Sequence, residues 1–480
     1  MSESQKPPVK IALLGCGTVG GGVLRLLEDN REFLASRVGA PLEVKHVLVR
    51  DLSKARVQEC KREWLTNDPE AIFGDKSVDL VVEVIGGEAP ARSYLERALK
   101  SGRSVVTANK FLISKHGPEL VRAAIDNRVD LAFEASVGGG IPIIRTLREA
   151  LASDTVASVH AILNGTCNYI LTRMREAGLS FAAALKEAQE LGYAEADPTL
   201  DVEGHDAAQK LSVVAMLAFD CSIGTDQFLI EGIRDIEDID FRFADRFGFT
   251  VKHLCIGYDR GEQVELRAHP ALVRKNSVLA NVDGVLNGVF VMGRALGPCL
   301  LVGRGAGDMP TAVSVVADIV DVASSRIHGE SGLATRGIQI KTRPVMSPDE
   351  IETRYYLRFD VGDHPGVLGR IASALGAEGV SIEQMVQEGR ASGEGGAVPV
   401  CILTHQTREG AVRRAIASIE KQAILKAPAH LIRIEDVKTR RWGRGPSRQD
   451  MLVLEEQITI SESRNHPRDP NRRGRCPLRY

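Results

Sequence analysis

The sequence predicts an α/β protein in three parts: a Rossmann-type doubly wound parallel sheet, a mixed α+β domain, and a C-terminal ferredoxin-like βαββαβ unit. Three observations lead to this prediction. Short apolar runs alternate with helical stretches over residues 1–133, longer helices dominate residues 134–335, and short strands and helices follow in the order β-α-β-β-α-β over residues 353–437. A chain of 480 residues also suggests about three domains.

The first part opens with a strand, a glycine turn and a helix. Val9–Leu14 is a mostly apolar run, and apolar residues resume at helical spacing after residue 20. Strands and helices then alternate, which implies a parallel sheet with helices on both faces. The expected strands are Leu42–Val49, Val78–Ile85, Ser104–Ala108 and Asp130–Ala135, and the expected helices include Ala91–Ser101 and Pro118–Asn127.

The second and third parts differ from the first in their patterns. We expect strands at Val156–Leu163 and Val264–His269, and a helix at Glu203–Phe219. The apolar helix at 311–328 is expected to pack back on the first domain, and residues 336–352, with Pro344 and Pro348, to form a linker. The elements expected in the third part are Tyr355–Val361, Gly366–Ala377, Val380–Gln387, Val398–His405, Glu409–Lys421 and Leu431–Val437.

Composition argues against several classes of protein. The formal net charge is -2, so no overall field attracts nucleic acid or an anionic membrane. The segment Met1–Lys10 has no apolar core of a signal peptide, and no uncharged run approaches the roughly 18 residues of a membrane span. We therefore expect a cytoplasmic protein with no membrane and no nucleic-acid partner. Its eight cysteines form no CxxC pair and are expected to be reduced thiols.

Residues 438–480 form a basic tail. The stretch Arg464–Arg479 is rich in Arg, Pro and Asn and nearly lacks large apolar residues, so the tail is expected to be disordered. Contact between this basic run and nucleic acid is the alternative, which is disfavoured because the rest of the chain has no basic face.

The glycine turn, Gly15-Cys16-Gly17-Thr18-Val19-Gly20, predicts a dinucleotide site. It follows a strand and opens a helix, which is the context that a GxGxxG motif requires. Gly15 permits the tight turn, Gly17 lets the backbone approach a pyrophosphate, and Gly20 lets the helix pack on the strand. The helix N-terminus attracts the phosphates. The alternative is a plain strand-to-helix turn.

The end of the second strand bears on the choice of nucleotide. An acid there would bind the adenosine ribose of NAD, whereas an arginine suits the 2′-phosphate of NADP. The chain has Arg50 followed by Asp51. We favour Arg50 as the contact to NADP, with Asp51 as the N-cap of a following helix. The alternative for Arg50 is a solvated loop cation.

Two lysines stand where proton transfer would be useful. Asp206 and Lys210 are four residues apart on a predicted helix and therefore share a face. A lysine in an apolar stripe is either part of a surface ion pair or a general acid–base group, since desolvation lowers its pKa. Lys110 follows a buried strand at its carboxyl end, where open α/β sheets bind ligands. The alternative there is a capping turn with a surface lysine.

Two further segments carry polar groups. The acidic loop at residues 192–201, GYAEADPTLD, suits a substrate with an ammonium group, or serves only capping and solubility. Glu134 precedes a glycine turn at residues 138–140, whose backbone carbonyls can hold a hard cation. The alternative for this turn is a simple strand-to-helix connection.

These motifs, in this order, resemble the homoserine dehydrogenase family over residues 8–437. The matching segments are TANK at Thr107–Lys110, EASVGGGIP at Glu134–Pro142, LNGTCNY at Leu163–Tyr169, GYAEADPTLDVEGHDAAQKL at Gly192–Leu211 and GRGAGDMPTA at Gly303–Ala312. The resemblance implies an oxidoreductase that interconverts L-homoserine and L-aspartate 4-semialdehyde in threonine, methionine and isoleucine biosynthesis. It also implies NADP as cofactor, with NAD possible, and a homodimer or homotetramer.

The resemblance implies roles for single residues. Lys210 is the expected proton donor and acceptor at the substrate oxygen, and Lys110 assists beside the cofactor. The expected substrate-binding acids are Glu195, which would hold the ammonium group, Asp201 and Asp206. The cofactor contacts add Thr18, Val19, Arg50, Lys110 and Gly307 to the turn glycines. A sodium ion is expected at Glu134, Val137, Gly139 and Ile141, mainly through backbone carbonyls. Two neighbouring lysines should depress each other's pKa.

The third part resembles an ACT domain. The segment Asp363–Gly369 joins its first strand to its first helix, where such domains bind amino acids, and the implied effector is threonine, acting by feedback inhibition. The alternative is a dimerisation module without a ligand. We expect a chain ending near Val345 to fold around its own core and the third part to act as a separate sensor. The expected effector-binding residues are Asp363, Gly366, Val367 and Leu368.

Two other functions stay open. One is a ligand-binding regulator that no longer catalyses, which the intact Lys110, Lys210 and Glu195 disfavour. The other is a dehydrogenase of the same layout that acts on a different amino acid or aldehyde. An aspartate-semialdehyde dehydrogenase is disfavoured because no cysteine lies in a convincing setting for a nucleophile.

Overall fold

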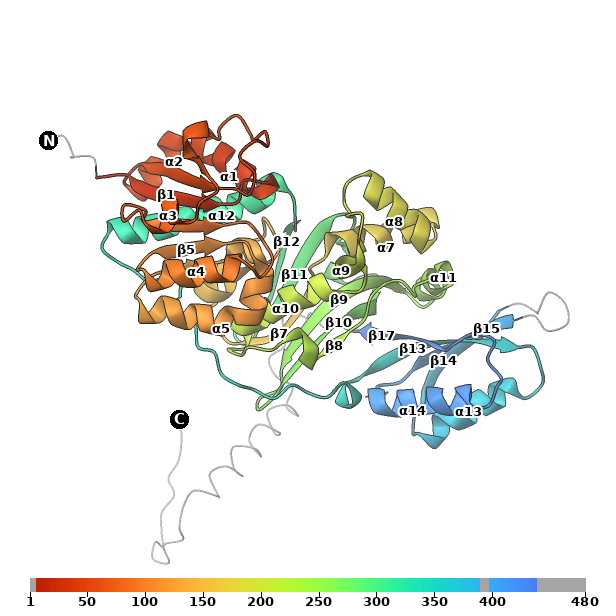
Figure 1. Ribbon diagram of the computed structural model, residues 1–480. Coiled ribbons are helices and arrows are strands. Elements are labelled where there is room, and N and C mark those ends of the chain that lie inside the picture. Colours follow the sequence, from red (N-terminus) through yellow and green to blue (C-terminus); the bar gives the residue numbers. More distant parts are fainter. Residues whose placement is uncertain (1–5, 336, 389–396, 438–480) are drawn as a thin grey trace, which may run out of the picture. The chain divides into compact units, whose positions relative to one another are not determined.

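A parallel sheet lies at the start of the chain in the computed structural model, which describes residues 6–335, 337–388 and 397–437 (Figure 1). The tail predicted at residues 438–480 lies outside this part. The strands stand in the order β3-β2-β1-β4-β5-β6, and every neighbouring pair is parallel. This strand order is that of a Rossmann fold and confirms the predicted class. The bounds are β1 Val9–Leu14, β2 Leu42–Leu48, β3 Leu65–Thr66, β4 Leu80–Glu83, β5 Ser104–Thr107 and β6 Leu131–Ala132.

Helices cover both faces of this sheet. In β1, Ile11 and Leu13 pack with α1, α2 and α12, whereas Ala12 and Leu14 pack with α4 and α5, because successive side chains of a strand point to opposite faces. The helix α12 comes from residues far along the chain and lies on α1, where a Cβ on Gly22 would be 3.0 Å from the Cβ of Ala312. The bounds are α1 Thr18–Asp29, α2 Arg31–Val38, α4 Ala91–Lys100, α5 Lys110–Asp126 and α12 Asp308–Ile327.

Two local features differ from the sequence prediction. Helix α5 begins at Lys110 rather than at Pro118, because Asn109 caps it by accepting a hydrogen bond from the Leu112 N–H at 3.2 Å. Its apolar stripe continues past Pro118, and the burial of that stripe outweighs the hydrogen bond that proline cannot donate. The helix expected after Asp51 is wrong. Asp51 instead accepts hydrogen bonds from the N–H and hydroxyl of Ser53, at 2.8 and 2.6 Å, in a side-chain turn.

The second sheet is mixed and, in the part of the chain that the structure describes, has the order β12-β11-β7-β9-β10-β17-β13-β15-β14. Strand β10 extends beyond the expected His269 to Arg274, because it pairs with the preceding strand β9 along its whole length and with the distant β17 at Ala271–Val273. The strands of the second part are β7 Val156–Ile162, β8 Leu229–Ile230, β9 Phe249–Asp259, β10 Val264–Arg274, β11 Leu286–Gly293 and β12 Gly297–Arg304. Its helices include α7 Gly165–Ala177, α8 Phe181–Glu190, α9 Thr199–Val202, α10 His205–Ala218 and α11 Asp238–Arg246.

The third part has the predicted βαββαβ order, but its sheet is not separate. Strand β17 pairs with β13 on one side and runs parallel to β10 on the other, with Ala271 opposite Arg433. The two parts also share a core, in which Phe241 and Phe249 pack with Tyr356 and Ile432. The third part is therefore joined to the second by a shared sheet and a shared core, and its role as a separate sensor stays a prediction. The bounds are β13 Glu352–Gly362, α13 Val367–Ala377, β14 Ile382–Gln387, β15 Ala397–Thr404, β16 Thr407–Arg408, α14 Glu409–Glu420 and β17 His430–Glu435.

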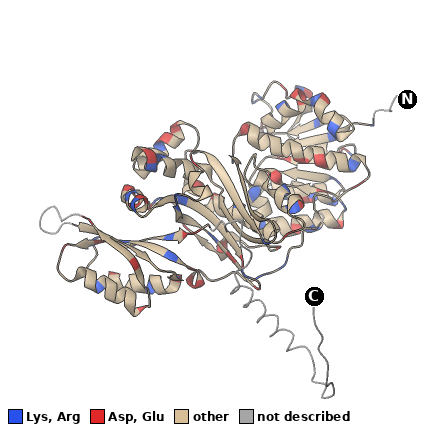
Figure 2. Ribbon diagram, turned by 180° about the vertical axis from the view of Figure 1, so that it is seen from behind, with Lys and Arg blue, Asp and Glu red and all other residues tan. Residues whose placement is uncertain are grey.

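Charged residues of both signs are intermixed along the described helices (Figure 2). Many of them form pairs one turn apart, such as Arg92 with Glu96 and Lys186 with Glu190. No helix among the described residues is both long and apolar enough to cross a membrane.

Removal of the third part is expected to destabilise the rest of the protein. A variant ending at Val345 would lose β17 and leave the buried Arg267 without Glu435, to which its Nη2 donates at 2.7 Å. Breaking a buried ion pair costs about 3–5 kcal/mol, so we expect its Tm to fall by about 10 °C or the variant to aggregate. Scanning calorimetry and light scattering measure both. A control variant ending at Val437 should keep the Tm of the full chain, and a stable, monodisperse shorter variant would contradict this expectation.

Candidate active site

The glycine turn lies between β1 and α1, as the sequence predicted. Gly15 has a φ of +102°, a conformation that favours glycine. A Cβ on Gly20 would lie 2.3 Å from the Gly15 carbonyl oxygen, so the helix can start this close to the strand only with glycine there. Gly17 faces open space, where a backbone N–H can approach a ligand. Thr18 and Val19 form the first turn of α1.

A cleft of about 780 Å³ adjoins this turn at the carboxyl ends of the strands. Arg50, at the end of β2, lines it together with Lys54 and Arg56, two cations that the sequence analysis missed. The Arg56 guanidinium also donates to the Cys16 carbonyl at 2.9 Å and so ties the loop after β2 to the glycine turn. Three cations beside a phosphate-binding turn fit an anionic dinucleotide. The group that the fold implies, a nicotinamide dinucleotide, therefore matches the residues present.

A buried carboxylate that sequence reasoning missed organises the loops beside this cleft. Glu83, at the end of β4, accepts hydrogen bonds from the N–H groups of Ile85 and Gly86 at 2.8 and 3.0 Å. Its other oxygen accepts from the Thr107 hydroxyl at 2.6 Å. Thr107 begins the segment that leads to Lys110, so Glu83 positions both the cleft loop and the start of α5.

Asp206 lies between the two lysines that the sequence singled out. Its Oδ2 is 2.7 Å from the Lys210 Nζ and its Oδ1 is 3.0 Å from the Lys110 Nζ. The Lys210 ammonium also donates to the Leu163 carbonyl at 2.8 Å. The side chain of Lys210 is 11% exposed, whereas that of Lys110 is 38% exposed. The two lysines, which are distant in sequence, thus meet at one carboxylate.

The carboxylate and the lysines stabilise one another electrostatically. Burial alone would raise the pKa of Asp206, but the charges of Lys210 and Lys110 hold that pKa well below its usual range. Asp206 raises the pKa of Lys110 against the effect of burial, and Asp201 and Glu195 add to the rise. The expected depression of a lysine pKa by its neighbour is therefore wrong for Lys110, because a carboxylate lies between the cations.

Asn164 joins two of the predicted substrate-binding acids. Its Nδ2 donates to Asp201 Oδ1 at 2.7 Å and to Asp206 Oδ2 at 2.9 Å, and its Oδ1 caps α7 by accepting from the Cys167 N–H. Burial, followed by the charge of Asp206, raises the pKa of Asp201. The segment LNGTCNY marked this region, but no local pattern assigned Asn164 a partner. Glu195 is exposed, and its backbone carbonyl accepts from the Gln189 amide at 3.0 Å.

The predicted cation segment is a buried turn. The Glu134 carboxylate accepts hydrogen bonds from the N–H groups of Ile144 and Arg145 at 2.8 and 2.7 Å, and burial raises its pKa. The carbonyl of Gly139 accepts from the Ser314 hydroxyl at 2.6 Å, while Val137 and Ile141 are buried beside it. Within the described ranges no three His, Cys, Asp or Glu side chains gather as a metal site. The oxygen atoms of Glu134 and of the turn carbonyls are of the kind that a hard cation prefers, and the cation itself stays a prediction.

The remaining predicted residues lie at helix starts. Gly307, with a φ of +122°, immediately precedes α12. In the third part, Gly366, with a φ of +89°, precedes α13, and Asp363 is exposed in the same loop. Val367 is buried in the first turn of that helix and Leu368 is half-buried. The four predicted effector residues therefore lie together, Asp363 and Gly366 in the loop between β13 and α13 and Val367 and Leu368 in the first turn of α13.

A Rossmann-type sheet with a phosphate-binding turn, and a lysine–aspartate–lysine cluster at its carboxyl edge, define an oxidoreductase that uses a nicotinamide cofactor. Comparisons with known proteins identify the family. The signature of homoserine dehydrogenase matches residues 142–320, that of its NAD binding domain matches 15–134, and that of the ACT domain matches 355–421. The chain belongs to the homoserine dehydrogenase family, whose members act in amino-acid biosynthesis, and it carries an ACT domain. The predicted resemblance is confirmed.

Individual relatives agree. The homoserine dehydrogenase of Neisseria gonorrhoeae is 42% identical over 434 residues, covering 90% of this chain and 99% of its own, and that of Pseudomonas aeruginosa is 40% identical with the same coverage. The crystal structure of a homoserine dehydrogenase from Thiobacillus denitrificans matches with a TM-score of 0.85 and 41% identity, covering 91% of this chain and 100% of that one. A hyperthermophilic archaeal homoserine dehydrogenase in complex with NADPH matches with a TM-score of 0.56 and 26% identity, over 66% of this chain and 97% of its own.

Substitution of Asp206→Asn is expected to reduce stability in a pH-dependent way. Because the folded-state pKa of Asp206 is lowered, its contribution is complete above a pH of about 4 and fades as pH falls through the folded-state value. Removing the carboxylate leaves two lysines facing each other, so we expect a loss of about 3 kcal/mol at pH 7 and a smaller difference at pH 3. Urea unfolding at both pH values measures it. Asp245→Asn, at an exposed pair with Lys275, is the control and should change little. An equal loss of unfolding free energy at pH 7 and pH 3 would contradict the assignment of a negative charge to Asp206.

Proposed function

We propose that this protein interconverts L-homoserine and L-aspartate 4-semialdehyde with NADP, in threonine, methionine and isoleucine biosynthesis. The observation that carries the proposal is the meeting of Lys110, Asp206 and Lys210 at the carboxyl edge of the cofactor-binding sheet. A buried lysine held by a carboxylate can exchange a proton with a substrate hydroxyl beside the cofactor. NAD is the alternative cofactor.

The chain's own residues handle the proton and the substrate. A nicotinamide dinucleotide held by the glycine turn would supply the acceptor for the hydride, a hydrogen with two electrons, that leaves the alcohol carbon of homoserine. The neutral amine of Lys210 takes the proton from the hydroxyl oxygen, and in the reverse direction its ammonium form returns one to the carbonyl oxygen. Lys110 assists beside the cofactor, and Asp206 holds both lysine side chains in place. Fixing these groups before the reaction removes the entropy cost of bringing them together.

Acids recognise the substrate at this site. Glu195, Asp201 and Asp206 bind homoserine, with Glu195 as the partner of its ammonium group. Support comes from Asn164, which holds Asp201 and Asp206 side by side, and from the effect of Glu195 on the pKa of Lys110. An exposed carboxylate near a buried ion cluster leaves room for a cationic ligand.

The cofactor site comprises Gly15, Gly17, Thr18, Val19, Gly20, Arg50, Lys110 and Gly307. The position of Arg50 at the end of β2, in a cleft with Lys54 and Arg56, supports a 2′-phosphate partner there. A monovalent cation, which we propose to be Na+, is bound by Glu134, Val137, Gly139 and Ile141. Its charge would compensate the buried Glu134 carboxylate.

We further propose that threonine inhibits the enzyme by binding at the β13–α13 loop, through Asp363, Gly366, Val367 and Leu368. The backbone N–H groups at the start of α13 suit an amino-acid carboxylate. The proposed domains are residues 1–133, 134–335 and 353–437, joined by the linker 336–352, in a cytoplasmic homodimer or homotetramer.

Steady-state kinetics test this function as a whole. The full chain is assayed with homoserine and either NADP+ or NAD+, in sodium or choline salt, with and without threonine. Homoserine-dependent reduction of NADP+ that sodium supports and threonine inhibits is the expected result. No turnover of homoserine with either cofactor would overturn the proposal and favour a binding protein that does not catalyse.

Substitution of Lys210→Ala is expected to lower kcat by at least about 100-fold, the usual contribution of a general acid–base group. The matched control is Lys186→Ala, which removes an exposed lysine of α8 paired with Glu190 at 3.8 Å. Initial rates at saturating substrates and circular dichroism of both variants provide the measurement. Near-normal turnover in a folded Lys210→Ala variant would assign proton transfer to another group.

Substitution of Arg50→Ala is expected to raise the KM for NADP+ about 10-fold and the KM for NAD+ much less, because only the 2′-phosphate loses a charged partner. Arg122→Ala, at an exposed pair with Asp126 on α5, is the control. Initial rates against each cofactor concentration give both constants. Equal rises in the two constants would assign the discrimination to Lys54 or Arg56.

A further inference from the structure

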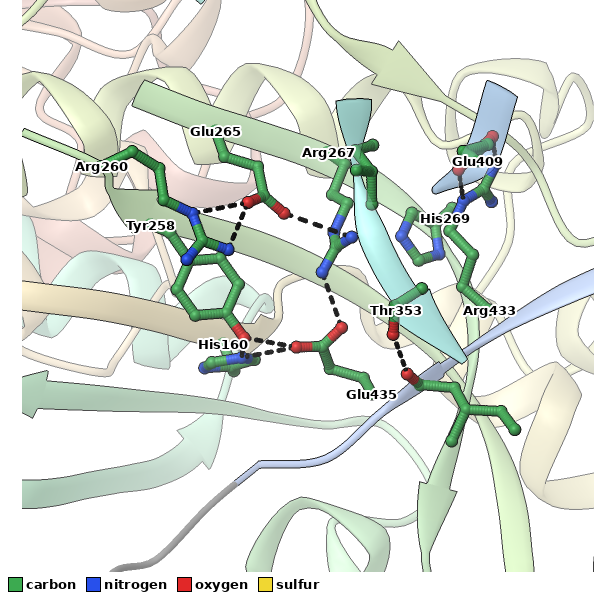
Figure 3. A network of polar contacts seen from close by, with 12 residues as sticks. His160, Tyr258, Arg260, Glu265, Arg267, His269, Thr353, Glu409, Arg433 and Glu435 are labelled. Carbon is green, nitrogen blue, oxygen red and sulfur yellow. Dashed lines mark hydrogen bonds and ion pairs between the residues drawn. The ribbon is translucent and has the colours of Figure 1, made fainter. Parts of the chain in front are cut away.

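Arg433, on strand β17 of the ACT domain, is a buried cation shared by two domains. The residue is 0% exposed. Its Nε donates to Glu409 of the ACT domain at 2.6 Å, a contact that Figure 3 shows, and its Nη1 and Nη2 donate to Glu231 of the catalytic domain at 2.7 and 3.0 Å. The Arg433 guanidinium thus bridges one carboxylate from each domain, in the bidentate geometry that arginine favours. The half-exposed Arg413 of α14 supplies the second positive charge, with its Nη2 3.3 Å from Glu231 and 2.6 Å from Glu409.

Glu231 is held by its main chain as well as by its side chain. It follows β8, and its N–H donates to the Ala268 carbonyl of β10 at 2.9 Å. Its carbonyl accepts from His253 Nε2 of β9 at 3.0 Å. Burial lowers the pKa of His253 to about 4, so the ring is neutral at pH 7 and donates from Nε2. A displacement of the Glu231 side chain therefore strains a segment that is tied at several points.

The segment after Glu231 supports the turn between α9 and α10. The N–H of Ile233 donates to the Val202 carbonyl at 2.8 Å, and a Cβ on Gly232 would lie 2.3 Å from the same oxygen. Gly204 packs on the same region, where a Cβ would lie 3.0 Å from His253 Nε2 and 3.1 Å from the Glu231 carbonyl oxygen. Residues 202–204 are thus enclosed by residues 231–233 and by His253, with little space for movement.

This turn sets the distance between two of the proposed substrate-binding acids. Asp201 is in α9, directly before the turn, and Asp206 is in the first turn of α10, directly after it. Both accept a hydrogen bond from Asn164 Nδ2, so a shift of the turn would break that shared contact. The same shift would move Asp206 away from Lys110, which belongs to the other domain.

We propose that Arg433 is a positioning residue through which the ACT domain sets the affinity of the catalytic site for homoserine, by way of Glu231 and the turn at residues 202–204. The proposal rests on the proposed function, because it takes Asp201 and Asp206 as substrate ligands. A buried arginine cannot leave one of its two carboxylates without a large cost, so β17 and the segment 231–233 move together. A movement of the ACT domain caused by any ligand is thereby transmitted to the turn at residues 202–204.

A second polar cluster on β17 has a different role. Glu435, two residues after Arg433 and on the same face of the strand, contacts Arg267, Tyr258 and His160 at 2.7, 2.6 and 3.1 Å (Figure 3). These partners lie on β10, β9 and β7, so Glu435 fixes β17 against the catalytic sheet. Glu435 anchors the strand, and Arg433 extends from that anchored strand toward the substrate-binding turn.

The test compares Glu231→Gln and Arg433→Met in the full-length chain. Each variant should raise the KM for homoserine about 3- to 30-fold while the KM for NADP+ changes less than about 2-fold, because the turn serves the substrate and not the dinucleotide cleft. Both substitutions remove the ion pair between Arg433 and Glu231, and Glu231→Gln also removes the pair with Arg413. The double variant should therefore resemble Glu231→Gln rather than combine the two effects. Glu231→Gln is nearly isosteric and keeps the test valid if Arg433→Met does not fold.

The control is Arg246→Met, which removes an exposed ion pair between α11 and Glu388 of the ACT domain. It breaks a contact between the same two domains without touching residues 231–233, so both KM values should stay unchanged. If the wild type is active and both variants fold, two results would overturn the positioning role alone. One is an unchanged KM for homoserine, and the other is an equal rise in the KM for homoserine and the KM for NADP+. A wild type that does not turn over homoserine would overturn the proposed function and this inference with it.

Discussion

The close packing of α5 on α10 is the constraint on which the active site depends. Lys110 is the first residue of α5, in the Rossmann domain, and Asp206 and Lys210 lie on α10, in the second domain. The helices approach closely at Gly117, where a Cβ would lie 3.1 Å from the Met216 sulfur. A buried carboxylate needs cations at short distance to offset its loss of hydration. The helix packing supplies the second cation from another domain, and the ion cluster can form only when the two domains are docked.

Strand β17 provides the corresponding constraint between the second and third domains. It pairs with β10 along Ala271–Val273, and so covers a strand edge that would otherwise be exposed. Backbone pairing alone would allow β17 to pair with β10 in more than one register. Only the observed register brings Arg433 to Glu231 and Glu435 to Arg267. The strand register, the ion pairs and the shared core around Tyr356 and Ile432 therefore all favour the same docking of the ACT domain on the second domain.

The parts of the site that could be predicted from the sequence are those formed by residues close together in the chain. The glycine turn follows a strand directly, and Asp206 and Lys210 are four residues apart on one helix, so their neighbourhood follows from secondary structure. Asn164, Glu83 and Arg433 were missed because each acts on partners far along the chain: Asn164 reaches Asp201 over 37 residues, Glu83 reaches Thr107 over 24, and Arg433 reaches Glu231 over 202. No pattern of hydrophobic spacing encodes such pairings.

Two findings that the sequence did not predict, the raised pKa of Lys110 and the continuity of the second sheet with β17, have the same physical origin. The raised pKa of Lys110 depends on a carboxylate lying between the lysines, and the continuity of the second sheet depends on β10 offering an edge to β17. Both are properties of contacts between domains, which the sequence of any one domain leaves undetermined. These contacts also consist of buried charges, which are costly to separate. Domains joined in this way stay paired when one of them shifts. A ligand of the ACT domain would therefore act by changing the balance between discrete arrangements of the joined domains.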